Sequence, residues 1–390
     1  MNAPDAPRPI YLDYAATTPL DPGVAAAMAE CFTADGTFGN PSSSSHAFGR
    51  EAAARVERAR ESIAALIDAP AECIVLTSGA TESINLALLG SVRAAVAARR
   101  HVVTSRTEHR AGLDACRQLE SEGVAVTYLT PDTKGILEPE QVRAALRSDT
   151  ALASIMHANN EIGVVQDIDA IGAICRERDV LLHVDAAQSV GKLPLQVSDL
   201  PIDLMSFTAH KLYGPKGIGA LYVAKRARGR IVPLLFGGGQ ERGLRPGTLA
   251  THQVVGFGVA AEIAATVLPT EAQRIVALRE RLWQALRAVP GSHLNGDARR
   301  RVPGLLNVSF EHVEGESLLA ALTGIAVSSG SACSSASQEP SYVLRACGRS
   351  TELAQGSLRF SVGRFTTAAD IDTAGSLVRE QVTRLRAVAA

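Results

Sequence analysis

The segment S-F-T-A-H-K-L-Y-G-P-K-G, residues 206–217, sets a histidine and a lysine side by side after an apolar run. Most lysines are solvated surface residues, and Lys211 has that simple interpretation too. A lysine at the end of a strand can also be an amine that forms a Schiff base with a carbonyl group. Polar residues that follow the neighbouring strands decide between these two interpretations.

Asp185 and Gln188 lie in H-V-D-A-A-Q-S, directly after another apolar run. A carboxylate buried there needs a cationic partner, and a protonated ring nitrogen would serve. Gln188 could then reach an oxygen on the same ring. The alternative is that Asp185 simply caps a helix after the strand.

The turn T-S-G-A-T-E-S, residues 77–83, joins a strand to an amphipathic helix. Unpaired N–H groups at a helix N-terminus bind phosphate, although an ordinary loop with a threonine cap explains the same pattern. Neither nucleotide-binding glycine fingerprint is present at this junction. A Schiff-base lysine, a carboxylate for a ring nitrogen and a phosphate turn together favour pyridoxal 5'-phosphate as the cofactor.

Three more residues follow or lie within apolar runs and are candidates for ligand contacts. His109, in T-S-R-T-E-H-R, could stack on a ring and move protons, or be a histidine in solvent. Asn159, in M-H-A-N-N-E-I-G, carries a short amide that could contact a ligand. Arg359, in S-L-R-F-S-V, could pair with a substrate carboxylate, and a salt bridge is the alternative.

Cys333 lies in V-S-S-G-S-A-C-S-S-A-S, residues 327–337, a run of serine, glycine and alanine without periodicity. We expect this segment to be a mobile, exposed loop. A free thiol in solvent is an oxidation liability unless it is used, so Cys333 is a candidate reactive residue. The other five cysteines lie in helix or strand patterns and are interpreted as core or incidental residues.

Apolar runs that alternate with amphipathic stretches would position these residues. The runs predict strands at residues 73–77, 101–105, 124–129, 151–156, 180–185 and 203–207. Helices are predicted at residues 113–122, 138–146 and 168–178. Continuous apolar strands separated by helices predict a mostly parallel α/β sheet covered on both faces. The carboxyl ends of such strands meet at one edge, where α/β enzymes bind ligands.

The pattern changes after about Thr251, where two helical stretches, 251–268 and 271–288, lead into a shorter α+β pattern. We therefore predict a large α/β domain and a smaller α+β domain. We assign residues 16–260 to the large domain, and 1–15 with 261–390 to the small one. The small domain would carry the loop with Cys333, at about 327–340.

The bulk properties of the 390-residue chain narrow the class of protein. A formal net charge of -1 does not favour a nucleic-acid partner, and no signal peptide or membrane span is recognised. The six cysteines show no paired spacing, which argues for a reducing compartment and against a structural zinc site. We expect a cytoplasmic protein.

Taken together, long ordered motifs between about Tyr11 and Arg386 closely resemble the cysteine desulfurases of the NifS/IscS type, which are pyridoxal-phosphate enzymes of the class V aminotransferase family. The motifs are Y-L-D-Y-A-A-T-T-P, F-G-N-P-S-S, T-S-G-A-T-E-S, T-E-H, M-H-A-N-N-E-I-G-V-V-Q, H-V-D-A-A-Q-S, S-F-T-A-H-K-L-Y-G-P-K-G-I-G-A-L, G-G-G-Q-E-R-G-L-R-P-G-T and S-S-G-S-A-C-S-S.

The resemblance implies a fold-type-I homodimer with a mostly parallel seven-stranded sheet, and it implies a role for each matching residue. Lys211 would form the Schiff base, Asp185 would pair with the pyridine nitrogen, Gln188 would contact the ring oxygen, and His109 would stack on the ring. The phosphate would be held by Ala80, Thr81, Thr208 and His210, with Thr248 reaching the cofactor of the other subunit. The substrate would be bound by Asn159, Arg359 and Asn40, and Asn159 would also contact the cofactor.

The implied reaction converts L-cysteine to L-alanine and leaves the sulfur as a persulfide on Cys333. The implied acceptors are an iron–sulfur scaffold protein, other cofactor pathways or tRNA thiolation. The resemblance implies no firm metal site, apart from a transient iron–sulfur contact at Cys333. Because the chain ends at V-A-A, where housekeeping relatives carry a longer tail, the identity of the acceptor stays open.

Two alternatives remain at this point. One is another pyridoxal enzyme of the same fold, such as an aminotransferase or a selenocysteine lyase. The other is a non-catalytic subunit that only holds partners for sulfur assembly, against which Lys211, Asp185 and His109 argue.

Overall fold

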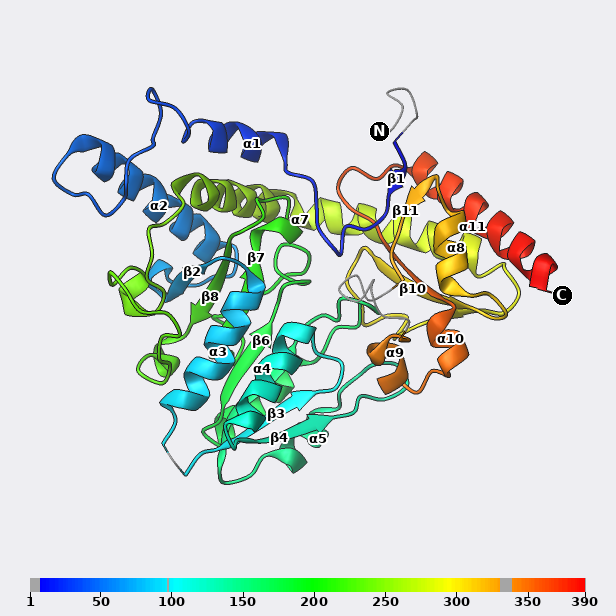
Figure 1. The fold of residues 1–390 in the computed structure, drawn as a ribbon, viewed down its shortest axis with the longest axis horizontal. Coiled ribbons are helices and arrows are strands. Elements are labelled where there is room, and N and C mark those ends of the chain that lie inside the picture. The colour runs from blue at the N-terminus through cyan, green and yellow to red at the C-terminus, as the bar shows by residue number, and fades with distance from the viewer. Residues whose placement is uncertain (1–7, 97, 330–338, 390) are drawn as a thin grey trace.

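The computed structural model describes residues 8–96, 98–329 and 339–389. Its central element is a seven-stranded sheet with the order β2-β8-β7-β6-β5-β3-β4 (Figure 1). The strands are β2 (Ile74–Thr77), β3 (His101–Ser105), β4 (Ala125–Leu129), β5 (Thr150–Met156), β6 (Leu181–Asp185), β7 (Leu204–Thr208) and β8 (Gly219–Val223). Only β8 pairs antiparallel with its neighbours, β2 and β7, within this sheet. The expected mostly parallel sheet is confirmed.

The six predicted strands each lie within one residue of an observed strand, while β8 was not predicted. The helices around the sheet are α1 (Pro22–Ala29), α2 (Ala47–Ala65), α3 (Ala80–Ala94), α4 (Arg110–Ser121), α5 (Pro139–Ala145) and α6 (Ile168–Glu177). Helix α4 begins three residues earlier than predicted, because His109 caps it.

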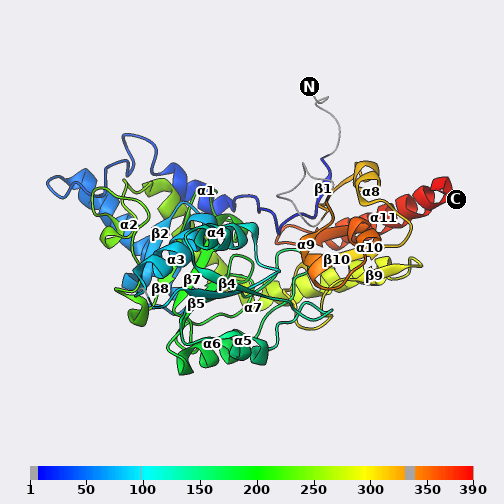
Figure 2. The ribbon, with the colours of Figure 1, turned by 60° about the horizontal axis from the view of Figure 1, so that its bottom comes forward.

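Helices cover both faces of the sheet, with α3 and α4 on one side and α5 and α6 on the other (Figure 2). Successive strand residues point to opposite faces, so each strand supplies two cores. Leu181 and Leu204 pack with α3 and α4, whereas Leu182 and Met205 pack with α2, α6 and the first half of α7. These cores fix the strands, and with them the strand ends that carry the candidate residues.

Helix α7 (Thr251–Leu286) is one continuous element, which corrects the prediction of two separate helices. Pro269 lies inside it, although proline usually ends or kinks a helix. The first half packs in the core beneath the sheet and the second half in another core, so burial on both sides stabilises the helix through the proline. By length and composition α7 could cross a membrane, but its packing identifies it as a core helix. The assigned boundary at 260/261 falls inside it.

The second core belongs to a smaller α+β part at the right of Figure 1. A three-stranded sheet there has the order β12-β10-β9. The elements are β9 (Ser292–Leu294), β10 (Leu305–Phe310), β12 (Ser357–Ser361), α8 (Gly315–Ala321), α9 (Tyr342–Ala346), α10 (Thr351–Gln355) and α11 (Ala368–Ala389). The chain start joins this part, because β1 (Ile10–Tyr11) pairs with β11 (Ile325–Ala326).

Candidate active site

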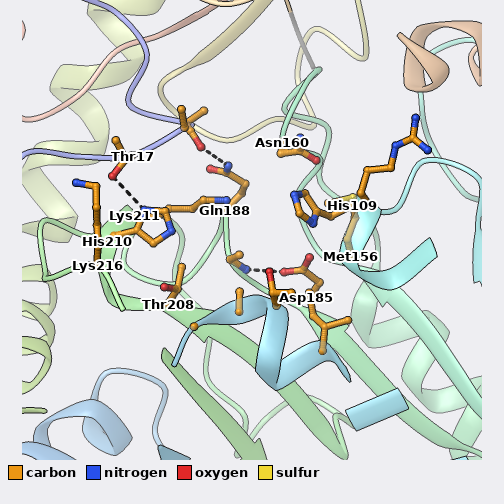
Figure 3. A pocket seen from close by; sticks show the side chains of 18 of the residues that line it. Thr17, His109, Met156, Asn160, Asp185, Gln188, Thr208, His210, Lys211 and Lys216 are labelled. Carbon is orange, nitrogen blue, oxygen red and sulfur yellow. Dashed lines mark hydrogen bonds between the residues drawn. The ribbon is translucent and has the colours of Figure 1, made fainter. Parts of the chain in front are cut away.

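A cavity of about 490 Å³ lies at the edge where four parallel strands end (Figure 3). Ser78 follows β2, Met156 ends β5, Asp185 ends β6 and Thr208 ends β7, and all four line the cavity. This is the edge where α/β sheets bind ligands. The sheet therefore gathers the predicted segments into one site.

The turn after β2 forms one wall of the cavity, with Ser78, Gly79, Ala80 and Thr81 lining it. Gly79 has a φ of 154°, a conformation that favours glycine, and it is the N-cap of α3. The carboxylate of Glu82 accepts a hydrogen bond from the Ser78 N–H (2.6 Å) and closes the turn. The first N–H groups of α3 are therefore presented where an anion can bind.

Asp185 and Gln188 lie on the cavity as predicted. Asp185 is 5% exposed, and its Oδ1 accepts a hydrogen bond from the Ala187 N–H (2.9 Å). Gln188 is 2% exposed; its Nε2 donates to the carbonyl of Ala15 (2.8 Å), and its Oε1 accepts from Lys192 Nζ (2.8 Å). Both side chains are held in one orientation by hydrogen bonds within the chain.

The short 3₁₀ turn Ala209–Lys211 follows β7 and brings Thr208, His210 and Lys211 to the cavity. The Thr208 hydroxyl donates to the Ile218 carbonyl (3.0 Å), and His210 Nδ1 lies 3.1 Å from the Thr17 hydroxyl. Burial and the neighbouring lysine charges lower the pKa of His210 to about 4. The ring is therefore neutral near pH 7 and can act as a hydrogen-bond partner without carrying charge.

His109 lines the cavity at the start of α4, where its Nδ1 accepts a hydrogen bond from the Ala111 N–H (3.1 Å). Burial lowers the pKa of His109 below its ordinary value; the charge of Asp185 opposes this and the charge of Lys211 adds to it. A neutral ring that accepts at Nδ1 carries its proton at Nε2. The structure thus fixes the tautomer of His109.

Asn159 does not line the cavity, and its amide forms hydrogen bonds inside the protein. Its Oδ1 accepts from the N–H groups of Glu161 and Ile162 (2.9 Å each), and its Nδ2 donates to the Thr107 carbonyl (2.9 Å). The neighbouring Asn160 lines the cavity instead, and its Oδ1 is buried with no hydrogen-bond partner among the described residues. Nothing in H-A-N-N-E distinguishes the two asparagines before the loop is folded.

Arg359 lines the cavity from the centre of β12 and is 2% exposed. Its Nη2 pairs with Asp13 (2.7 Å), and its Nη1 donates to the Asn160 carbonyl (2.9 Å). The salt bridge that the sequence left as an alternative is present, and Nε of the same guanidinium is buried without a partner among the described residues. Arg359 can therefore form the salt bridge with Asp13 and still offer Nε to a substrate carboxylate.

Two predicted residues lie away from the cavity. Asn40 is exposed, and its Oδ1 accepts a hydrogen bond from the Ser42 N–H (2.9 Å). Thr248 is exposed and follows Gly247, which has a φ of 117°. The predicted roles of these two residues at the substrate and at the other subunit's cofactor stay predictions.

Two buried acids near the site were not predicted from the sequence. Glu108 Oε1 accepts from the Met156 N–H (2.9 Å), and burial raises the pKa of Glu108 well above its ordinary value. Glu161 lines the cavity and accepts a hydrogen bond from Ser341, and burial raises its pKa as well. A glutamate in a loop motif carries no sequence signal of burial, so only the fold could reveal these groups.

Cys333 lies outside the described residues. The five described cysteines are all buried and free. Burial raises the pKa of the thiols of Cys116, Cys175 and Cys347 to about 12. These three thiols remain protonated near pH 7, as expected for core residues.

The residues of the cavity fit pyridoxal 5'-phosphate. The volume is in the range of cofactor sites. Helix N–H groups at one wall suit a phosphate, the buried carboxylate of Asp185 suits a protonated ring nitrogen, and Lys211 supplies an amine. The buried Oδ1 of Asn160 is a further polar atom for a bound molecule to satisfy.

Comparisons with known proteins agree with this fit. The aminotransferase class-V family matches residues 10–373. A cysteine desulfurase IscS from Aeromonas hydrophila is 58% identical over 378 residues, which cover 97% of this chain and 94% of that protein. A solved NifS-like protein has a TM-score of 0.89 at 34% identity and covers 96% of this chain and 100% of its own. The structure of SspA in complex with cysteine has a TM-score of 0.81 at 39% identity, with coverages of 92% and 100%.

Proposed function

The chain belongs to the aminotransferase class-V family and is a pyridoxal-phosphate-dependent cysteine desulfurase, and we propose that Lys211 and Cys333 are its two reactive residues. The observation that carries the proposal is the position of Lys211 in one cavity with the α3 N-terminus and Asp185. The similarity to desulfurases over 97% of the chain supports the choice of L-cysteine as substrate.

Bound pyridoxal phosphate supplies the electron sink that weakens bonds at the α-carbon of an amino acid. In this chain, Lys211 would hold the cofactor through its amine and take the α-proton of the substrate. Asp185 would keep the proton on the pyridine nitrogen. The amide of Gln188 would donate a hydrogen bond to the ring oxygen, and neutral His109 would stack on the ring with a proton available at Nε2.

The phosphate would be bound by the wall at Ala80 and Thr81 together with Thr208 and His210. Arg359 and Asn160 would orient the substrate carboxylate, with Asn160 taking the place first given to Asn159. Asn40 would also contact the substrate, although its side chain lies outside the cavity in the single chain.

Cys333 would accept the sulfur. L-Cysteine loses its sulfur atom and becomes L-alanine, and that atom is inserted into the S–H bond of Cys333 to give a persulfide. The Cβ–S bond breaks, an S–S bond forms, and no external oxidant or reductant is needed. The acceptor of the persulfide sulfur would be an iron–sulfur scaffold protein or another sulfur-acceptor protein.

We also propose that the protein is a cytoplasmic homodimer. Most of the large apolar side chains exposed in the described part of the chain lie between residues 32 and 48 or between 232 and 236. Phe236 is 87% exposed and Phe38 is 51% exposed. A second copy packed on this surface would bury them and could bring Thr248 to the neighbouring cofactor.

The test is an assay of alanine and sulfide release from L-cysteine by the purified protein loaded with pyridoxal phosphate. We expect Lys211→Ala to abolish the cofactor's protein-bound absorbance and to lower turnover by at least about 10²–10⁴-fold. Cys333→Ala should keep the absorbance and lose the persulfide. Lys225→Ala, at an exposed lysine, and Cys31→Ala are matched controls and should retain activity.

Two results would contradict the proposal. Alanine release from cysteine that is undiminished in Cys333→Ala would favour a different pyridoxal enzyme. A wild-type protein that binds no pyridoxal phosphate would exclude the cofactor.

A further inference from the structure

Lys192 is a third lysine near the site, besides Lys211 and Lys216, and neither the sequence motifs nor the proposed mechanism uses it. It lies in the turn after β6, where its backbone N–H donates to the Ser189 carbonyl (2.9 Å). Gly191 precedes it with a φ of 72° and packs against Leu212 and Ala264. This tight turn leaves Lys192 partly buried and directs its side chain to the interior.

The amine of Lys192 is bonded to a residue of the active site. Nζ donates to Oε1 of Gln188 at 2.8 Å, and the other end of the same amide, Nε2, donates to the Ala15 carbonyl at 2.8 Å. Gln188 and Ala15 both line the main cavity, and in Figure 3 Gln188 lies between His210 and His109. Gln188 therefore lies between the amine of Lys192 and the main cavity.

Lys192 occupies an unfavourable place for a cation. It lines a second cavity of about 50 Å³, which it shares with Gln188 and Lys211. Burial, and then the charges of Lys211 and Arg359, lower the pKa of Lys192 to about 7. Burying an ammonium group costs free energy that an apolar side chain in this position would not cost. We therefore expect the lysine to have a role that compensates for this cost.

The role follows from the difference between an ammonium group and an amide. A lysine has only donors, whereas the glutamine amide has a donor end and an acceptor end that exchange when the group rotates by 180°. In its ammonium form, Lys192 is satisfied only if Oε1 faces it. With Oε1 held there, Nε2 is the end that can meet an oxygen in the main cavity.

We propose that Lys192 is a positioning residue that fixes the amide of Gln188 with its Nε2 donor toward the ring oxygen of the cofactor. This inference rests on the proposed function, because it concerns how the same site recognises pyridoxal phosphate. Without Lys192 only the hydrogen bond from Nε2 to the Ala15 carbonyl holds the amide, so the orientation of its donor end is less tightly fixed. In the orientations where Nε2 turns away, the charged oxygen of the cofactor loses a hydrogen bond.

The experiment is a double-mutant cycle between Lys192→Met and Gln188→Ala, read by the Kd of the apoprotein for pyridoxal phosphate. Losing a hydrogen bond to a charged group weakens binding about 10- to 100-fold, and we expect this from either single variant. Because Lys192 acts through Gln188, the double variant should bind no more weakly than Gln188→Ala alone. The pH midpoint of the cofactor's visible absorbance band should differ between Lys192→Met and the wild type. The double variant should have the same midpoint as Gln188→Ala alone.

Two further variants control the cycle. Lys192→Arg keeps a cationic donor and should retain most of the affinity, and it keeps the test decisive if Lys192→Met fails to fold. Lys225→Met removes an exposed lysine and should bind like the wild type.

A Kd of Lys192→Met equal to that of the wild type would overturn the inference, as would additive effects of the two substitutions. Both results leave the proposed function intact when the wild type binds the cofactor and releases alanine. Failure of the wild type to bind pyridoxal phosphate is a separate result and counts against the proposed function itself.

Discussion

The site at the strand ends and the surface beside it differ in how much of each is buried and hydrogen-bonded within one chain. We call Asp185, Gln188, Thr208, His210 and Lys211 the floor, and residues 32–48 and 232–248 the outer loops. The floor lies mostly buried in one cavity, with Asp185, Gln188, Thr208 and His210 held by hydrogen bonds within the chain. The outer loops expose Phe38 and Phe236 to solvent.

This difference indicates which region can form within a single chain and which region needs a partner. Parallel strands fix their own carboxyl ends, so the floor needs no partner to form. The second outer loop is anchored at its base, because buried Glu241 accepts two hydrogen bonds from Arg60 (2.7 Å each) and one from the Leu76 N–H (2.7 Å). Thr248 lies beyond this anchor and is exposed. We infer that the floor is preformed and that the outer loops are completed by a second copy.

The largest expected effect comes from removing Glu241, which holds the second outer loop against α2 and β2. In Glu241→Ala, buried Arg60 loses its buried carboxylate partner and keeps only the more exposed Glu57, and breaking a buried ion pair costs about 3–5 kcal/mol of stability. Chemical denaturation of the apoprotein measures this change. Asp372→Ala removes an equally well-formed but exposed partner of Arg281 and should have little effect. Equal stability of the two variants would mean that the anchor is not a stabilising contact.

The next effect tests the floor alone. Asp185→Asn removes the charge proposed to hold the ring proton, and we expect turnover to fall about 10²–10³-fold while the dimer persists. Asp169→Asn, at an exposed aspartate in α6, is the matched control. Turnover of Asp185→Asn within a factor of about two of wild type would contradict the role given to the floor.

The third effect tests whether the outer loops act across a dimer. Thr248→Ala should weaken cofactor binding about 10- to 100-fold, because one hydrogen bond to a charged phosphate is lost. Mixed dimers of Lys211→Ala and Thr248→Ala chains then separate the two arrangements. If Thr248 serves the partner, one of the two sites in each mixed dimer is intact and about half of the wild-type activity returns. No recovery would show that Thr248 acts in its own chain or not at all.

The smallest expected effect is on the pH dependence of stability, and it comes from His183, a buried histidine in β6. His183 is buried between the hydroxyls of Ser154 (2.8 Å) and Ser206 (2.9 Å), and burial lowers its pKa to about 3. The unfolded chain binds a proton below its ordinary pKa of about 6.5, whereas the folded chain does not. Its contribution to stability is therefore complete above pH 6.5 and is lost as the pH falls toward 3, by up to about 1.4 kcal/mol per pH unit.

His183→Asn should therefore reduce the fall in stability between pH 6.5 and 4, measured by denaturation of the apoprotein. Buried Glu108 and Glu161 titrate in the opposite sense, and the difference between variant and wild type removes their contribution. His312→Asn, at an exposed histidine, should leave the profile unchanged. Identical profiles for His183→Asn and wild type would contradict the assignment.

Local sequence patterns were sufficient for the strands that build the floor. A continuous apolar run between turns is typical of a buried parallel strand, so the polar residue after each run could be located before the fold was known. Lys211, Asp185, Gln188, Thr208 and His109 were placed in this way or through the family motifs, and all of them line the cavity.

Three features depended on information that a local pattern does not hold. Helix α7 continues through Pro269 because it is buried in two cores. The sequence did not predict strand β8, although it is as long as β6 and β7, because it directly follows a glycine-rich turn. Adjacent asparagines differ in role because the loop uses the amide of Asn159 and leaves that of Asn160 at the cavity.

By itself, the sequence determined the order of elements, the edge of the sheet that binds a ligand and the cofactor that suits it, because each depends on residues close together in the chain. The tertiary structure decided which side chains hold the reactive ones in place. Asp13 meets Arg359 across 346 residues, and the carbonyl of Ala15 meets the amide of Gln188 across 173 residues. Such contacts form only when distant segments pack, since packing alone sets the distance between their polar atoms.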